Sequence, residues 1–96
     1  CGAIKGACDH ARLGNLTALI NKIEPAVEVR QEPTDENLRN SKNLEFVDAV
    51  SAKNVELTID NIKKQSPVLA EMEENGEIMI VGAMYDIATG AVDFYN

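Results

Sequence analysis

The apolar run at residues 78–81 (Ile-Met-Ile-Val) constrains the fold of this chain more than any other segment. Such a run predicts a strand that is apolar on both faces, which is typical of a sheet covered by helices on both sides. Thr89 and Gly90 then predict a turn, after which residues 91–95 return as an antiparallel strand. The sequence offers no third strand, and a lone hairpin is only marginally stable in water. We therefore expect the missing strands to come from an upstream segment, from another subunit, or from a rearranged packing.

Helical patterns dominate the N-terminal part of the chain. Residues 2–12 are small and apolar, and they predict a short helix with one closely packed face. Residues 13–14 (Leu-Gly) interrupt the pattern, and Asn15 can cap a second helix. Pro25 predicts that this second helix kinks or ends near Glu24. Its expected apolar stripe consists of Leu16, Leu19, Ile20, Ile23 and Val27.

The C-terminal part begins with a polar stretch. Residues 30–43 are almost wholly polar and predict a loop, and residues 44–64 predict a long helix. Residues 66–67 (Ser-Pro) are a typical helix start, and residues 75–76 (Asn-Gly) a typical stop. The side chains expected to face inward are Val47, Val50, Val55, Ile59 and Ile62 in the long helix, and Val68, Leu69 and Met72 in the short one.

Length and charge exclude several classes of function. At 96 residues the chain is one small domain or part of one. Its net charge of −7 argues against nucleic acid as a partner and against an anionic membrane surface. It has no apolar run near the roughly 20 residues that span a bilayer.

The two cysteines, Cys1 and Cys8, do not form a disulfide framework. On one helix their Cα atoms would lie about 10 Å apart, at roughly 1.5 Å per residue, whereas a disulfide requires about 7 Å or less. They are therefore expected to be free thiols, or one metal ligand and one packed thiol. Reduced cysteines favour a cytoplasmic location, although weakly.

Cys1 and Gly2 are the strongest candidates for a chemical role. A cysteine between a strand and a following helix has its thiolate stabilised by the N-terminus of the helix, and a thiolate binds zinc. A glycine beside it lets backbone and a small substrate approach closely. An isolated Cys-Gly pair is nevertheless more often an inert thiol.

A local metal site made from Cys1, Cys8 and His10 is the alternative. Ligand atoms must converge within about 2.0–2.3 Å of zinc, which side chains two turns apart on one helix do not easily do. We therefore expect Cys8 to pack as a small apolar residue and His10 to lie on the surface. Tyr85, beside the apolar strand, is expected to be a packed ring.

Three separated segments resemble the C-terminal half of β-class carbonic anhydrases. They are residues 1–9 (Cys-Gly-Ala-Ile-Lys-Gly-Ala-Cys-Asp), 13–17 (Leu-Gly-Asn-Leu-Thr) and 80–86 (Ile-Val-Gly-Ala-Met-Tyr-Asp). In that family a zinc motif His-x-x-Cys-Gly stands where this chain begins. Because Cys1 is not preceded by Met, we expect the chain to be part of a longer protein.

The resemblance implies an α/β fold in which helices pack on a mostly parallel sheet. Residues 1–96 would be the C-terminal part of one such domain, supplying its helical half and a C-terminal hairpin. It also implies a homodimer or higher homo-oligomer, and zinc held by two Cys and one His. Cys1 would be a zinc ligand and Gly2 would line the site. The other ligands, one of them in a Cys-x-Asp-x-Arg motif, are expected upstream.

The implied reaction is the reversible hydration of carbon dioxide to bicarbonate, with zinc lowering the pKa of bound water to about 7. The 96 residues alone are expected to be inactive, because one thiolate does not fill a zinc shell that normally uses three protein ligands. Two alternatives remain open. One is a non-catalytic oligomerisation module derived from the same fold, and the other is a small metal-binding protein that uses the local site.

Overall fold

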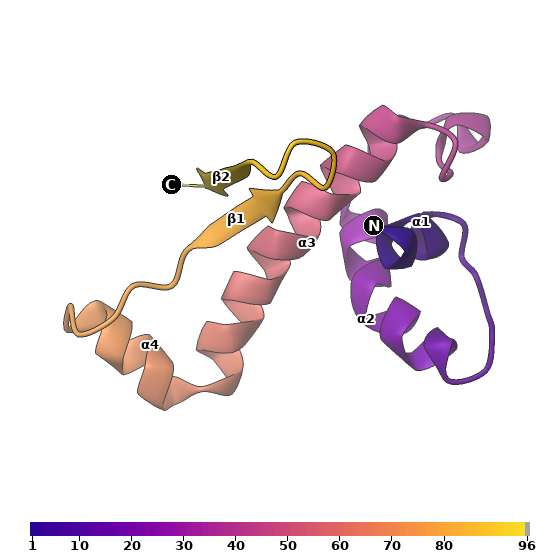
Figure 1. Cartoon of the computed structure of the whole chain (residues 1–96). Coiled ribbons are helices and arrows are strands. Elements are labelled where there is room, and N and C mark those ends of the chain that lie inside the picture. The colour runs from indigo at the N-terminus through magenta and orange to yellow at the C-terminus, as the bar shows by residue number, and fades with distance from the viewer. Residues whose placement is uncertain (96) are drawn as a thin grey trace. The chain divides into compact units, whose positions relative to one another are not determined.

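The computed structural model describes residues 1–95 and contains mostly helix (Figure 1). The chain divides into two units, Cys1–Asn54 and Val55–Asn96. Its elements, in chain order, are α1 (Gly2–Cys8), α2 (Leu16–Val29), the 3-10 helix η1 (Glu36–Leu38), α3 (Leu44–Gln65), α4 (Pro67–Glu74), β1 (Gly82–Tyr85) and β2 (Val92–Tyr95).

The buried core lies in the first unit, where α1 packs closely against α2. A Cβ added at Gly6 of α1 would lie 3.2 Å from Cδ1 of Ile20 in α2, so the missing side chain of Gly6 lets the two helices approach. Small and branched apolar side chains from α1, α2 and the first turns of α3 fill the core. They are Ile4, Ala7, Cys8, Ile20, Ile23, Ala26, Val27, Phe46, Val47 and Val50.

The proline in α2 does not end the helix, so of the two predicted outcomes an end near Glu24 is wrong. Pro25 lies inside α2, and the helix continues to Val29. An interior proline costs about 3 kcal/mol. Ala26 and Val27 follow it and are almost fully buried. Burying a valine side chain contributes roughly 1.5–3 kcal/mol, so continued burial offsets much of that cost.

The expected apolar stripe of α2 is buried only in its second half. Ile20, Ile23 and Val27 lie in the core as predicted, whereas Leu16 and Leu19 are 42% and 48% exposed. Asn15 precedes the helix as expected but its side chain makes no capping hydrogen bond. Instead, the hydroxyl of Thr17 accepts a hydrogen bond of 2.8 Å from the backbone N–H of Leu13.

The second unit contains the C-terminal half of α3, α4 and the hairpin, and none of its described large apolar side chains is fully buried. Ser66 caps α4 as predicted, its hydroxyl accepting from the N–H of Leu69 at 3.2 Å. Val68 and Leu69 were expected to face inward, but they are exposed. The long helix matches its predicted span, although Ile62 near its end is exposed rather than buried.

The hairpin follows the predicted turn. β1 and β2 are antiparallel, with Gly82 opposite Tyr95 and Tyr85 opposite Val92. Gly82 lies against α3, because an added Cβ there would be 2.5 Å from Cγ1 of Val55. Only a glycine permits β1 to approach the helix this closely.

The sheet differs from the one expected. Within residues 1–95 there is one two-stranded antiparallel sheet and no parallel pair, so the expectation of a mostly parallel sheet is not met by this chain. The apolar run at residues 78–81 lies just before β1 and not in a strand. A strand that is apolar on both faces needs neighbouring strands to hydrogen-bond with its backbone. Among the described residues β1 pairs only with the short β2, so residues 78–81 have no such neighbour.

The burial pattern of α2 predicts unequal effects for two neighbouring residues. Ile20→Ala leaves a cavity in the core and should lower the free energy of unfolding by about 2–5 kcal/mol. Leu19→Ala, half exposed on the same helix, should lower it by less than about 1 kcal/mol. Denaturant unfolding followed by circular dichroism measures both. Equal losses would contradict the assignment of Ile20 to the core.

Candidate functional site

Cys1 stands at the start of α1 with its thiol exposed. It occupies the cap position, and its carbonyl accepts a hydrogen bond of 3.1 Å from the backbone N–H of Lys5. Cys1 is a free cysteine, and its side chain makes no capping hydrogen bond. Gly2 follows with open space beside it, because an added Cβ would meet nothing within 4 Å. The two residues proposed from the sequence therefore lie at an accessible corner of the first unit.

Cys8 has the opposite environment. It is a free thiol that is 1% exposed in the core, as predicted for a packed apolar residue. Burial raises the pKa of the Cys8 thiol above its ordinary value of 9.0, and the adjacent charge of Asp9 raises it further. A thiol that is buried and neutral at physiological pH is a poor nucleophile and a poor metal ligand.

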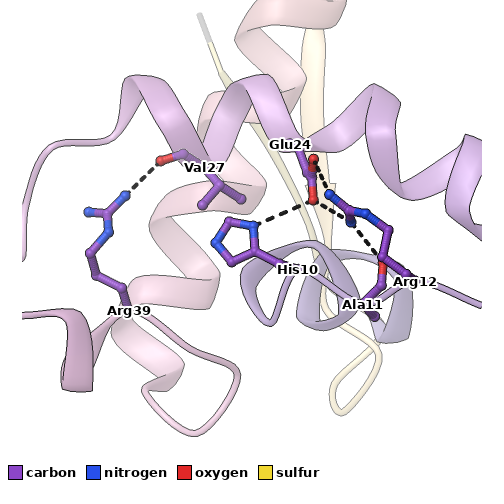
Figure 2. Close-up of polar contacts among 6 residues, drawn as sticks. All are labelled: His10, Ala11, Arg12, Glu24, Val27 and Arg39. Atoms are coloured by element: carbon purple, nitrogen blue, oxygen red, sulfur yellow. Dashed lines mark hydrogen bonds and ion pairs between the residues drawn. The ribbon is translucent and has the colours of Figure 1, made fainter.

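His10 follows α1 in a left-handed backbone conformation, with a φ of 54°. Its side chain is 61% exposed, as expected, and its Nδ1 lies 3.5 Å from Oε1 of Glu24. The same carboxylate forms two hydrogen bonds with Arg12, at 2.7 Å and 3.2 Å (Figure 2). The segment after α1 is thus held to α2 by one bidentate pair.

This pair changes the titration of the carboxylate. The hydrogen bonds from Arg12 are the main reason that the pKa of Glu24 lies below its ordinary value, and His10 acts in the same direction. Asp9, close by in sequence, also has a lowered pKa, because it accepts hydrogen bonds from Ser41, the one from the backbone N–H being 2.8 Å.

Arg39 holds the polar stretch 30–43 against α2. Its guanidinium donates to the carbonyl of Val27 at 2.9 Å (Figure 2). It also donates to the carbonyl of Pro33 at 2.9 Å and lies 4.9 Å from the ring centre of Phe46. The carbonyl of Val27 belongs to the last turn of α2, where a cation also interacts favourably with the helix dipole. The stretch is otherwise the predicted loop, interrupted by η1.

Neither arrangement was foreseen from the sequence. Arg12 and Glu24 are twelve positions apart in the sequence, and so are Val27 and Arg39. No local pattern links residues at such a spacing. Only the turn after α1 and the path of the polar stretch bring them together.

The structure does not assemble the local metal site considered from the sequence. Among residues 1–95, no group of three His, Cys, Asp or Glu side chains is placed to hold a metal ion. Cys1 and His10 are exposed, whereas Cys8 is enclosed in the core, so their donor atoms face different surroundings. These residues by themselves do not fit a zinc ion.

A shallow groove of about 250 Å³ also lies in the first unit. Its described lining contains no cysteine and no histidine, and it does not include Cys1 or Gly2. The lining residues are Arg30, Glu32, Pro33, Leu38, Asn43, Glu45 and Phe46.

Comparison with known proteins identifies the family. The model of the carbonic anhydrase family matches residues 1–92, which is nearly the whole chain. The chain therefore belongs to the carbonic anhydrase family, and the resemblance to its β class is confirmed. No curated protein and no solved structure matches the chain. None of the helices in residues 1–95 is both long and apolar enough to cross a membrane.

The two thiols should differ strongly in reactivity. In the native protein at pH 8, a thiol reagent such as iodoacetamide should modify Cys1 rapidly and Cys8 at least tenfold more slowly, because only exposed thiolates react. Cys1→Ser should leave only the slow site, and a denaturant should make both sites fast. Mass spectrometry with peptide mapping measures the two rates. Equal native rates would contradict the burial of Cys8.

The ion pair at Glu24 predicts a pH dependence. Its folded-state pKa is lowered, so its stabilising contribution is complete above the ordinary value of 4.5 and is lost as the pH falls through the lower folded value. Arg12→Gln should raise the pKa of Glu24 toward 4.5, as followed by NMR of the side-chain carboxyl carbon. Arg30→Gln, a change at a guanidinium that donates to the carbonyl of Glu32, should leave the Glu24 titration unchanged.

Proposed function

We propose that this chain takes part in the reversible hydration of carbon dioxide to bicarbonate, as a component of a β-class carbonic anhydrase. The observation that carries the proposal is the family match over residues 1–92, which begins at Cys1. The thiol of Cys1 is free and exposed, so it is available to bind a metal ion, and this supports the proposal further.

In this proposal Cys1 is a zinc ligand and the backbone at Gly2 lines the site beside the substrate. The open space next to Gly2 leaves room for a small molecule. Zinc, when bound, supplies a Lewis acid that activates water at neutral pH. The other protein ligands, expected N-terminal to Cys1, lie outside this chain. Residues 1–96 would then be the C-terminal part of a single domain.

The residues of this chain position the thiol of Cys1. The core between α1 and α2 fixes the start of α1, and the buried Ala7 and Cys8 anchor that helix. The pair between Arg12 and Glu24 holds the segment that follows α1. Carbon dioxide and bicarbonate are the proposed substrates. We also propose a homodimer or higher homo-oligomer and a cytoplasmic location, the latter supported by two free thiols.

A second candidate is a non-catalytic oligomerisation module of the same family. The observation that favours it is the hairpin, whose side chains Tyr85 and Phe94 are 59% and 62% exposed. Tyr85 was expected to be packed, and its exposure shows that this surface has no cover among residues 1–95.

The catalytic proposal predicts different effects for the two cysteines. The 96-residue chain with added zinc should not accelerate carbon dioxide hydration in a stopped-flow assay. When it is joined to an N-terminal segment that carries the Cys-x-Asp-x-Arg motif and the zinc-ligand His, activity should appear. Cys1→Ser should then lower zinc content and reduce the rate at least a hundredfold, whereas Cys8→Ser should retain most of both.

Either of two results would contradict this proposal. The first is zinc-dependent activity of the 96 residues alone, which would require a complete ligand set within them. The second is full activity of the joined protein after Cys1→Ser, which would remove Cys1 from the site.

A further inference from the structure

The end of α4 is a Schellman motif that is built on Asn75 and Gly76. Gly76 has a φ of 78°, the left-handed conformation in which many helices end. Its backbone N–H donates to the carbonyl of Glu73 at 3.1 Å, and the N–H of Glu77 donates to the carbonyl of Met72 at 2.9 Å. These two bonds satisfy carbonyls that the helix would otherwise leave without partners. The end of α4 therefore depends on the backbone of Asn75 and Gly76.

These two residues form the one Asn-Gly pair of the sequence, and both are exposed. The backbone nitrogen of Gly76 is a nucleophile close to the side-chain amide of Asn75, and glycine has no side chain to hinder closure of a ring between them. The space beside Gly76 is open, because an added Cβ would meet nothing within 4 Å. Asn15 is a matched case: it is exposed and makes no capping hydrogen bond, but the bulkier Leu16 follows it.

The hydrogen bond from Gly76 to Glu73 must break before the nitrogen of Gly76 can react. Two properties of α4 make this opening easy. The helix has only 8 residues, and none of them is buried. A helix of that length is not stable by itself in water, and a helix end with few buried contacts opens locally without global unfolding. Opening of the last turn frees the nitrogen of Gly76 and lets it approach the side chain of Asn75.

We propose that Asn75 is a site of spontaneous deamidation, reached when the end of α4 opens. The backbone nitrogen of Gly76 loses its proton to solvent and attacks Cγ of Asn75. A C–N bond forms, the side-chain nitrogen takes up a proton and leaves as ammonia, and a succinimide ring results. Water then opens the ring at either carbonyl carbon, which gives aspartate or isoaspartate. The sequence of steps consumes one water, releases one ammonia and involves no oxidation.

The modification acts as a one-way switch on the second unit. Either product adds a carboxylate at the C-terminal end of α4, where the helix dipole disfavours negative charge and where residues 71–77 already contain four glutamates. Isoaspartate also lengthens the backbone by one carbon, which is incompatible with the Schellman motif. Glu73, in the same turn, pairs with Lys63 at 2.7 Å and accepts from the N–H of Ile80 at 3.0 Å. Loss of this turn therefore loosens the contacts of α4 with α3 and with residues 78–81.

Incubation of the 96-residue chain at pH 7.4 and 37 °C, followed by tryptic digestion and tandem mass spectrometry, tests the proposal. Peptide 65–96 contains Asn75 and Asn96, which fragment ions distinguish. Digestion of the fresh chain gives the value at zero time. We expect Asn75 to become aspartate and isoaspartate at least tenfold faster than Asn15 is modified, with release of ammonia. Modification of Asn75 no faster than that of Asn15 would overturn the proposal.

Two further measurements test the opening step and the chemistry. Unfolding in guanidinium chloride should speed the reaction at Asn75 several-fold, because the bond from Gly76 to Glu73 is then lost. Equal rates in the folded and unfolded chain would contradict the opening step. Asn75→Gln should abolish the fast reaction, since its longer side chain has to close a larger ring. Fast release of ammonia from peptide 65–96 of that variant would overturn the assignment to Asn75.

Hydrogen exchange measures the effect on the second unit. The amides of Gly76, Glu77 and Ile80 should exchange faster in Asn75→Asp, which adds the charge without the extra backbone carbon, and faster still in the aged chain. Asn75→Gln should exchange like the fresh chain, and the amides of α2 serve as an unchanged reference in the first unit. Unaltered exchange at Gly76 and Ile80 in the aged chain would contradict the switch.

Discussion

The close approach of α1 to α2 is the contact on which the first unit depends. Gly6 leaves space for Ile20, and the small side chains of Ala7 and Cys8 complete the buried surface of α1. A seven-residue helix is too short to be stable by itself in water, so this packing, and not helix propensity, maintains it. The position of Cys1 at the start of α1 follows from the same contact.

The two units differ in how completely they bury their apolar side chains. All of the fully buried apolar side chains belong to residues 1–54, whereas the hairpin and α4 leave large side chains exposed. Polar contacts contribute to order in the second unit. Glu73 pairs with Lys63 at 2.7 Å and accepts from the backbone N–H of Ile80 at 3.0 Å. The functional proposal concerns the well-packed unit.

Local signals predicted the helices well. The Ser-Pro pair before α4 and the glycine at residue 76, with a φ of 78°, act at the positions expected from capping and turn chemistry. Pro25 shows the limit of such rules, because α2 continues past it and burial of the residues that follow offsets much of the cost of the lost hydrogen bond. The prediction that Val68 and Leu69 of α4 face inward was wrong for a related reason. Periodicity shows which side of a helix is apolar, but not whether anything covers it.

For the candidate site, the sequence by itself determined the residue types and the family: a cysteine followed by glycine at the start of a helix, within a match to carbonic anhydrases over residues 1–92. It also determined that Cys8 would pack, since small apolar neighbours surround it in the helical pattern. Only the tertiary structure decided that Arg12 pairs with Glu24, that Arg39 holds the polar stretch, and that the side chains of Tyr85 and Phe94 stay exposed. These features join residues far apart in the chain, and their energies depend on distances and solvent exposure that exist only after folding.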